Sequence, residues 1–185
     1  MARWEPDGRR RLQQAAVELY AERGFAETTV AAVAERAGLT ERTFFRHFAD
    51  KREVLFGNED ALTAQLAEAV AAAPADAGPR ALADHGLAAI VRALQPRHAE
   101  LRRREPIVAA HPELRERELM KLASWTAALR TALEDRGVTA RTAALVAETS
   151  VAVLNVAAQR WLGGDGGEDL ATLLAEDSAV LRELG

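Results

Sequence analysis

The sequence contains no cysteine, and this absence removes disulfides, thiolate nucleophiles and cysteine-based metal sites. It fits a reducing compartment, where disulfides are rare. No unbroken apolar run approaches the roughly 18 residues of a membrane span. Residues 1–11 are polar and charged, unlike a secretory signal. We therefore expect a cytoplasmic protein that has no membrane partner.

Motifs of enzyme chemistry are also lacking. The four histidines, at positions 47, 85, 98 and 111, show no metal-ligand spacing. No nucleophile elbow or dinucleotide fingerprint occurs, and the GGDGG stretch at residues 163–167 follows a predicted helix rather than a strand. The alternating charges of residues 113–118 (ELRERE) favour a solvated helix face. We expect no enzymatic activity, no metal and no cofactor.

Patterns typical of β-strands are missing as well. Apolar residues recur at helical spacing, and no run of β-branched or aromatic residues alternates with polar ones. Caps, glycines and prolines divide the chain into about nine predicted helices, which span residues 7/8–23, 30–37, 41–48, 50/51–72, 80–94, 97–110 (broken near Pro106), 112–136, 139–162 and 169–184. The sequence therefore predicts an all-α fold.

Charge is divided unevenly along the chain. The net charge of the whole chain is −4, but residues 1–52 carry net +2 and residues 53–185 carry net −6. Basic charge in the N-terminal part favours an anionic partner there, and the acidic remainder would be repelled by nucleic acid. Arg3 and Arg9–Arg11 can reach phosphate or a minor groove as a basic arm, or they can belong to a solvated tail.

Residues 24–51, GFAETTVAAVAERAGLTERTFFRHFADK, contain two short helical patterns joined by a glycine turn. Thr29 can cap the first helix and Thr40 the second. Gly38 can adopt the left-handed conformation that a tight helix end needs. Two helices joined in this way form a helix-turn-helix, in which the second helix enters the major groove of DNA.

The second helix has a composition suited to DNA. Phe44 and Phe48 share one face and can anchor the helix to a small core with Leu19, Phe25 and Val33. The remaining faces carry groups that can bind base edges or phosphate, namely Glu41, Arg42, Thr43, Arg46 and His47. An ordinary amphipathic hairpin of helices would show the same spacing, so the pattern by itself leaves both interpretations open.

This stretch resembles the DNA-binding domain of the tetracycline-repressor (TetR) family of bacterial regulators. The resemblance covers about 45 residues and includes Gly24, Phe25, Thr28, Thr29, Ala37, Gly38, Thr40, Phe44, Phe45, His47, Phe48 and Lys51. Phe45 stands where the family usually has tyrosine, and Arg42 stands where many members have glycine. The resemblance implies a DNA-binding domain at residues 1–50 and an effector-binding and dimerisation domain at residues 51–185.

Lys51 is predicted to lie in the first turn of the fourth helix, where a phosphate would satisfy both the lysine and the free backbone N–H groups. The complete set of predicted DNA contacts is Thr28, Thr29, Thr40, Glu41, Arg42, Thr43, Phe45, Arg46, His47 and Lys51.

The helix at residues 139–162 is apolar nearly all round, which predicts burial on every side. A partner subunit would provide this burial if two copies of the last two helices formed a four-helix bundle, as the resemblance also implies. Burial within one subunit is the alternative. The predicted homodimer interface contains Val146, Ser150, Val151, Leu154, Ala158, Leu173 and Leu181. A dimer would read two half-sites of a palindromic operator.

A few polar or bulky residues on the apolar helices predict a small-molecule site. The candidates are His85, Met120, Trp125, Asn155 and Gln159. Core packing is the alternative for Trp125, and hydrogen bonding across a dimer is the alternative for Asn155 and Gln159. The predicted function is a one-component transcriptional regulator, a repressor released by a small and largely apolar ligand. A dimeric DNA-binding regulator without an effector, and an activator, are the alternatives.

Overall fold

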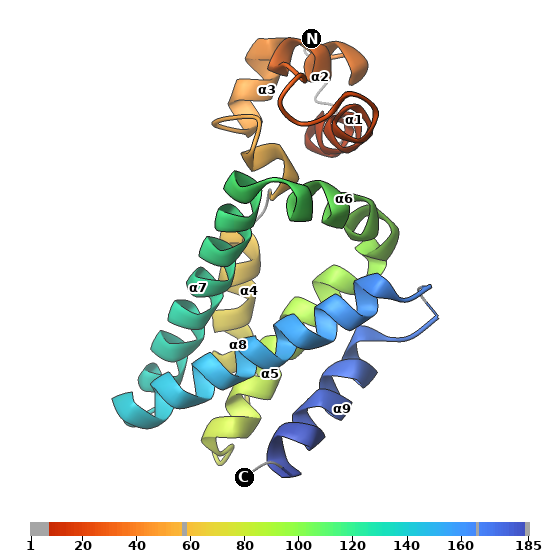
Figure 1. Ribbon diagram of the computed structural model, residues 1–185. Coiled ribbons are helices and arrows are strands. Elements are labelled where there is room, and N and C mark those ends of the chain that lie inside the picture. Colours follow the sequence, from red (N-terminus) through yellow and green to blue (C-terminus); the bar gives the residue numbers. More distant parts are fainter. Residues whose placement is uncertain (1–7, 57–58, 166, 184–185) are drawn as a thin grey trace. The chain divides into compact units, whose positions relative to one another are not determined.

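The computed structural model describes residues 8–56, 59–165 and 167–183, and Figure 1 shows that helices joined by turns and loops make up this part of the chain. The helices are α1 (Gly8–Arg23), α2 (Val30–Arg36), α3 (Glu41–His47), η1 (Glu53–Leu55), α4 (Glu59–Ala71), α5 (Pro79–Leu94), η2 (Gln95–Arg97), α6 (His98–Ala110), α7 (Pro112–Asp135), α8 (Ala140–Gly163) and α9 (Leu170–Glu183). No strand occurs among these residues, so the all-α prediction is confirmed.

The chain divides into two compact units. The first unit contains residues up to 57 together with residues 103–118, and the second contains residues 58–102 and 119–185. The chain passes between the units again after residue 102, inside α6, and after residue 118, inside α7. The sequence did not indicate that residues 103–118 pack with the N-terminal helices. The functional boundary at residue 50 stays a prediction.

The helix caps, the glycine turn and the small core of the first unit form as the sequence predicted. The Thr29 hydroxyl caps α2 by accepting a hydrogen bond from the Ala32 N–H (3.2 Å), and the Thr40 hydroxyl caps α3 in the same way through Thr43 (3.2 Å). Gly38 has a φ of +65°, the left-handed conformation that follows the end of α2. The predicted core is confirmed, since one buried cluster contains Leu19, Phe25, Val33, Phe44 and Phe48.

Two predicted helix boundaries are wrong. The fourth helix does not run continuously from residue 50 or 51, because the chain first makes a turn and the short helix η1 before α4 begins at Glu59. The Asp50 carboxylate stabilises this turn by accepting hydrogen bonds from the Arg52 and Glu53 N–H groups, at 2.7 and 2.9 Å. Second, α6 continues through Pro106 instead of breaking there.

The second unit encloses a separate apolar core. Its fully buried members include Leu66, Leu82, Leu87, Ile90, Leu129, Leu133, Ala147 and Trp161. Helix α4 packs against α5, and α8 packs against both α5 and α9 (Figure 1). Gly86 permits the close approach of α5 to α4, because a Cβ atom at Gly86 would lie 2.9 Å from Cγ2 of Val70 in α4.

Helix α8 is the one described helix that is long and apolar enough to cross a membrane by length and composition. Its residues Ala143, Ala147 and Ala157 are fully buried in the core of the second unit. A buried core helix meets the same criteria, so this finding is weak evidence for a membrane segment.

Candidate functional site

Helix α3 presents two faces of different character. Phe44 is fully buried and the adjoining Phe48 is 2% exposed, so this side anchors the helix to the core. The opposite side exposes Arg42, Arg46 and Phe45, whose side chain is 55% exposed. Neither arginine forms an ion pair with another described residue. The outer face of α3 therefore offers two guanidinium groups and one aromatic ring to a partner.

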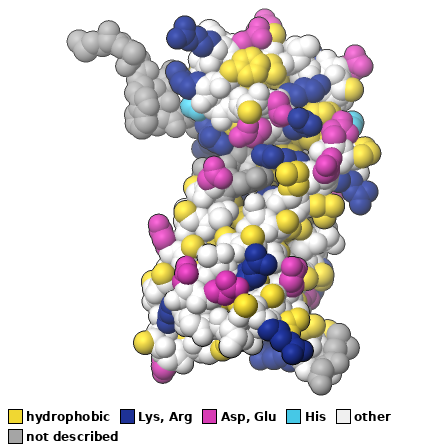
Figure 2. Space-filling model, turned by 90° about the vertical axis from the view of Figure 1, so that its left-hand side faces the viewer, with side chains coloured by type: hydrophobic (Ala, Val, Ile, Leu, Met, Phe, Trp, Pro, Cys, Tyr) yellow, Lys and Arg dark blue, Asp and Glu magenta, His cyan; other side chains and the backbone are white. Residues whose placement is uncertain are grey.

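The surface around α3 is not uniformly basic. Figure 2 shows Lys and Arg side chains interspersed with Asp and Glu side chains over the first unit. Arg36 of α2 is engaged by Glu18 and Glu22 of α1, at 3.4 and 2.8 Å. The available positive charge is therefore concentrated in a few side chains rather than spread over a broad field.

The threonines predicted to contact DNA have structural partners. Thr28 is 2% exposed and donates a hydrogen bond to the Gly24 carbonyl (2.8 Å), which closes the turn between α1 and α2. This burial leaves its hydroxyl no access to a DNA phosphate. Thr29 and Thr40 are exposed but serve as helix caps, and the Thr40 and Thr43 hydroxyls lie 3.1 Å apart.

Arg9 and Arg11 of α1 link helices instead of forming a free arm, whereas Arg10 is exposed. Arg9 lies over the Phe48 ring, 4.7 Å from its centroid, and donates to the His47 carbonyl (3.4 Å). Arg11 donates to the Ala37 carbonyl at the end of α2. Burial lowers the pKa of His47, and the nearby Arg46 and Arg9 lower it further. His47 is thus mainly neutral near pH 7. Arg3 lies outside the described residues.

Lys51 is held inside the first unit. Its Nζ atom donates to the carbonyls of Phe25, Ala26 and Thr28 at 2.9, 3.1 and 3.3 Å, and it lies 4.5 Å from the centre of the Phe25 ring. An ammonium group has three donors, so these carbonyls use all of them. The Tyr20 hydroxyl also donates to the Lys51 carbonyl (2.7 Å). The predicted position in the first turn of a long helix is wrong.

The carboxylate of Asp50 occupies the place that was predicted for phosphate. It binds the backbone N–H groups of the turn, as described above. Burial alone would raise the pKa of Asp50, but the hydrogen bonds from Arg52 and from the backbone lower it overall, so the carboxylate stays charged. The phosphate contact of Lys51 itself remains a prediction. The alternative is that Lys51 stabilises the first unit through its hydrogen bonds to the three carbonyls.

Replacing Lys51 by methionine separates these two roles. We expect the free energy of unfolding to fall by about 2 kcal/mol, because three carbonyls lose a charged donor. We expect the dependence of DNA affinity on salt to stay unchanged. Urea unfolding and binding titrations at several salt concentrations measure the two quantities. A salt slope that falls by about one unit, with unchanged stability, would restore the phosphate role.

Arg104 is a buried charged residue whose contacts the sequence did not indicate. It is 6% exposed, donates to the Leu55 carbonyl (2.8 Å), pairs with Glu118 and lies 4.4 Å from the centre of the Phe56 ring. The interpretation of residues 113–118 as a solvated face is therefore wrong for Glu118. All four residues belong to the first unit.

The predicted effector residues do not form one site. His85 is exposed and its Nδ1 lies 2.8 Å from the Ala81 carbonyl of its own helix. Met120 is 56% exposed, whereas Trp125 is 3% exposed in the core, and its indole N–H has no hydrogen-bond partner among the described residues. Asn155 is half-buried and Gln159 is exposed. Their role in ligand binding remains a prediction.

Hollows that open on the second unit include the following three. One of about 470 Å³ lies between α5 and α9, and one of about 650 Å³ lies between α4 and α7. The third, about 330 Å³, lies between α8 and α9 and is lined by Thr149, Ala152, Val153, Val156, Asp177, Val180 and Leu181. None of the predicted effector residues lines these hollows.

The exposed apolar face of α8 and α9 differs from the predicted interface. Four predicted members, Ser150, Val151, Leu154 and Leu173, are at most 4% exposed within the chain itself. The other three, Val146, Ala158 and Leu181, are half-buried. Large apolar side chains instead project at Leu145 (60% exposed), Val156 (51%) and Val180 (55%), which we name the α8–α9 face.

A capped helix-turn-helix with an outward-facing α3, followed by a larger helical unit, defines a helix-turn-helix regulatory protein. Residues 12–57 match the family model of the tetR family of bacterial regulatory proteins. These residues include the whole of α2, α3 and η1.

The chain is also similar to individual known proteins in sequence and in fold. HTH-type transcriptional regulator TcmR of Streptomyces glaucescens is 38% identical over 71 residues, which are 38% of this chain and only 31% of that relative. FadR of Thermus thermophilus, solved with lauroyl-CoA, has a TM-score of 0.57 at 24% identity, covering 95% of this chain and 93% of that one. A Pseudomonas aeruginosa PAO1 putative transcriptional regulator has a TM-score of 0.66 at 17% identity, covering 99% and 93%. These structures share the fold.

Proposed function

We propose that this protein is a dimeric, one-component transcriptional regulator that binds a palindromic DNA operator through α3. The outward face of α3 carries the proposal, because Arg42 and Arg46 project there without an ion-pair partner among the described residues. Arginine can bind guanine edges or phosphate, and the buried Phe44 fixes the orientation of the helix. A protein of this kind acts in the cytoplasm, where its DNA lies.

The α8–α9 face supports the dimer. Leu145, Val156 and Val180 expose large apolar side chains around an apolar hollow, and such a patch is typical of a protein interface. A two-fold interface uses the same surface on both copies. One α3 reads only a few base pairs, so two copies would supply the second half-site.

The hollows of the second unit support a small-molecule effector. Other proteins of this fold have been solved with small molecules, for example FadR with lauroyl-CoA and SmeT with triclosan. We propose that a ligand with apolar character binds here and favours the state that does not bind DNA, so that the protein is a repressor released by its ligand. A regulator without an effector, or an activator, are the other candidates.

A gel shift tests the DNA-binding function. The purified full chain is mixed with the DNA upstream of its own coding sequence, with random competitor DNA, at two salt concentrations. We expect a specific complex that contains two chains per operator and weakens with salt. A selection from random-sequence DNA is run in parallel. A folded protein that enriches no sequence in this selection would exclude sequence-specific DNA binding.

Replacing Arg42 by alanine should cost about 1–3 kcal/mol of binding free energy at particular operator positions, because a base-edge contact is lost. Affinities are measured for the operator and for its single-base variants. Arg130, an exposed arginine of α7, provides a control with the same change of charge, and Arg130→Ala should leave the profile unchanged. An equal loss by Arg42→Ala on every sequence would assign Arg42 to phosphate instead.

A further inference from the structure

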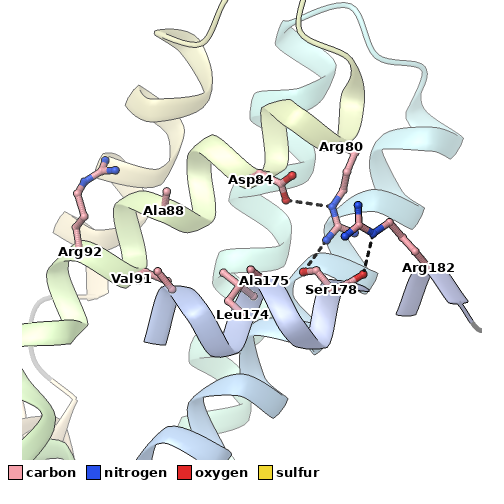
Figure 3. Close-up of a pocket in the computed structure, with 10 residues that line it drawn as sticks. Arg80, Asp84, Ala88, Val91, Arg92, Leu174, Ala175, Ser178 and Arg182 are labelled. Atoms are coloured by element: carbon pink, nitrogen blue, oxygen red, sulfur yellow. Dashed lines mark hydrogen bonds and ion pairs between the residues drawn. The ribbon is translucent and has the colours of Figure 1, made fainter. Parts of the chain in front are cut away.

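The hollow between α5 and α9 has the features of an amphipathic ligand site (Figure 3). The two helices run antiparallel, since Arg80 at the start of α5 donates to the Ser178 hydroxyl (2.9 Å) and Gln95 beyond its end accepts from the Leu170 N–H (3.0 Å). The resulting groove of about 470 Å³ has a polar end at Arg80 and an apolar floor. We name it the α5–α9 groove.

Two guanidinium groups converge at the polar end. Arg80 donates to the Ser178 hydroxyl, and the Arg182 Nε donates to the Ser178 carbonyl (3.3 Å). Figure 3 shows the two guanidinium groups beside each other at this serine. Among the described residues that line the groove, Asp84 is the one carboxylate, and it lies 3.0 Å from the Arg80 Nε. Arg182 has no ion pair with another described residue, so the described side chains at this end carry more positive than negative charge.

Small and aliphatic side chains form the floor. They project from one face of each helix and comprise Ala88 and Val91 of α5 with Ala171, Leu174 and Ala175 of α9. From Ser178 to Ala171 the groove follows α9 for about 10 Å, at 1.5 Å per residue. Arg92 stands at the far end. An apolar tail of medium length fits this distance.

We propose that the α5–α9 groove binds an amphipathic monocarboxylate, with its head between Arg80 and Arg182 and its apolar tail along the floor. Guanidinium matches the planar carboxylate through paired hydrogen bonds. The bound anion would also neutralise the repulsion between the two arginines. Asp84 disfavours a more highly charged head group, which selects a carboxylate over a phosphate monoester.

This groove is separate from the α8–α9 face. The groove uses Leu174, Ala175 and Ser178 of α9, whereas the hollow beside Val156 uses Asp177, Val180 and Leu181. The two sets are centred on different sides of α9, and Leu174 and Leu181, which are seven residues apart, lie at the border between them. A dimer centred on the α8–α9 face therefore leaves the polar end of the groove, at Arg80 and Arg182, outside the centre of the interface.

Calorimetric titration of the full chain tests the binding. The probes are octanoate, 1-octanol with a similar tail but no charge, acetate with the head alone, and octyl phosphate. We expect octanoate to bind at least about tenfold more tightly than the other three, and Arg182→Ala to weaken octanoate about tenfold or more. Arg130→Ala is the matched control and should bind octanoate like the unmodified chain. Thermal unfolding of each variant checks that it is folded.

Equal binding of octanoate and 1-octanol, or unchanged octanoate affinity in folded Arg182→Ala, would overturn the proposal. Stronger binding of octyl phosphate would overturn the choice of a carboxylate. The effector role rests on the proposed function and has its own readout, the operator affinity with and without octanoate. Octanoate that binds in the groove but leaves operator affinity unchanged would exclude the effector role only. If the ligand-free chain binds no operator, this result would contradict the proposed DNA-binding function and would leave the ligand site in the groove unaffected.

Discussion

Replacing Arg104 by alanine is expected to lower the free energy of unfolding of the first unit by about 3 kcal/mol. The change leaves the Leu55 carbonyl without its donor and Glu118 without its cation, and it uncovers the Phe56 ring. Removing one member of a buried charged network costs more than the network gains on forming, because the remaining polar groups stay desolvated. Urea unfolding followed by circular dichroism measures the loss.

The neighbouring Arg103 supplies a matched control, since it is exposed and changes the charge equally when replaced. Arg103→Ala should shift the unfolding free energy by less than about 0.5 kcal/mol. Arg104→Lys keeps the charge but cannot reproduce the planar fork, so we expect an intermediate loss. Equal stability of the Arg103 and Arg104 variants would show that the buried network contributes nothing measurable.

Replacing Val156 by glutamate is expected to convert the proposed dimer into a monomer and to weaken the proposed operator binding about 100-fold or more. An isologous interface would bring two such carboxylates into the same apolar contact, where unpaired charges cost several kcal/mol. The monomer would then bind only one half-site. Sedimentation equilibrium measures the assembly, and a gel shift measures the affinity.

The control for this change is Ala123→Glu, which adds the same charge at an exposed position of α7. It should remain dimeric and bind the operator normally. A Val156→Glu variant that remains dimeric would move the interface away from the α8–α9 face. In that case the residues predicted from sequence, Val146, Ala158 and Leu181, would be the next to change.

The features that sequence predicted correctly are those whose causes lie within a few residues. Thr29 and Thr40 cap helices through N–H groups three positions away, and Gly38 ends a helix by its own conformation. Phe44 and Phe48 share a face because they are four residues apart. These local rules were enough to predict the helix-turn-helix and its core.

The misplaced residues have partners that are distant along the chain. Lys51 binds carbonyls 23 to 26 residues earlier, and Arg104 binds one 49 residues earlier. Nothing in the composition of either segment indicates these partners. Sequence analysis therefore did not anticipate that Lys51 and Arg104 bind backbone carbonyls of their own chain.

The predicted interface residues differ from the exposed α8–α9 face for a different reason. Helix α8 is apolar nearly all round, so its hydrophobic pattern does not determine which side faces the core of its own chain. Packing against α5 and α9 decides this, and it buries Ser150 and Leu154 while it exposes Val156. The orientation of such a helix about its axis needs three-dimensional contacts.

The noncontiguous first unit has a consequence for exchanging parts between related regulators. Ile107, Val108 and Leu114 belong to the buried core that the N-terminal helices share. A graft that transplants residues 1–57 alone would leave this core partly open and would remove the guanidinium that binds the Leu55 carbonyl. The transplantable module is therefore two separate segments, and a chimera that changes operator specificity should carry residues 103–118 from the same parent.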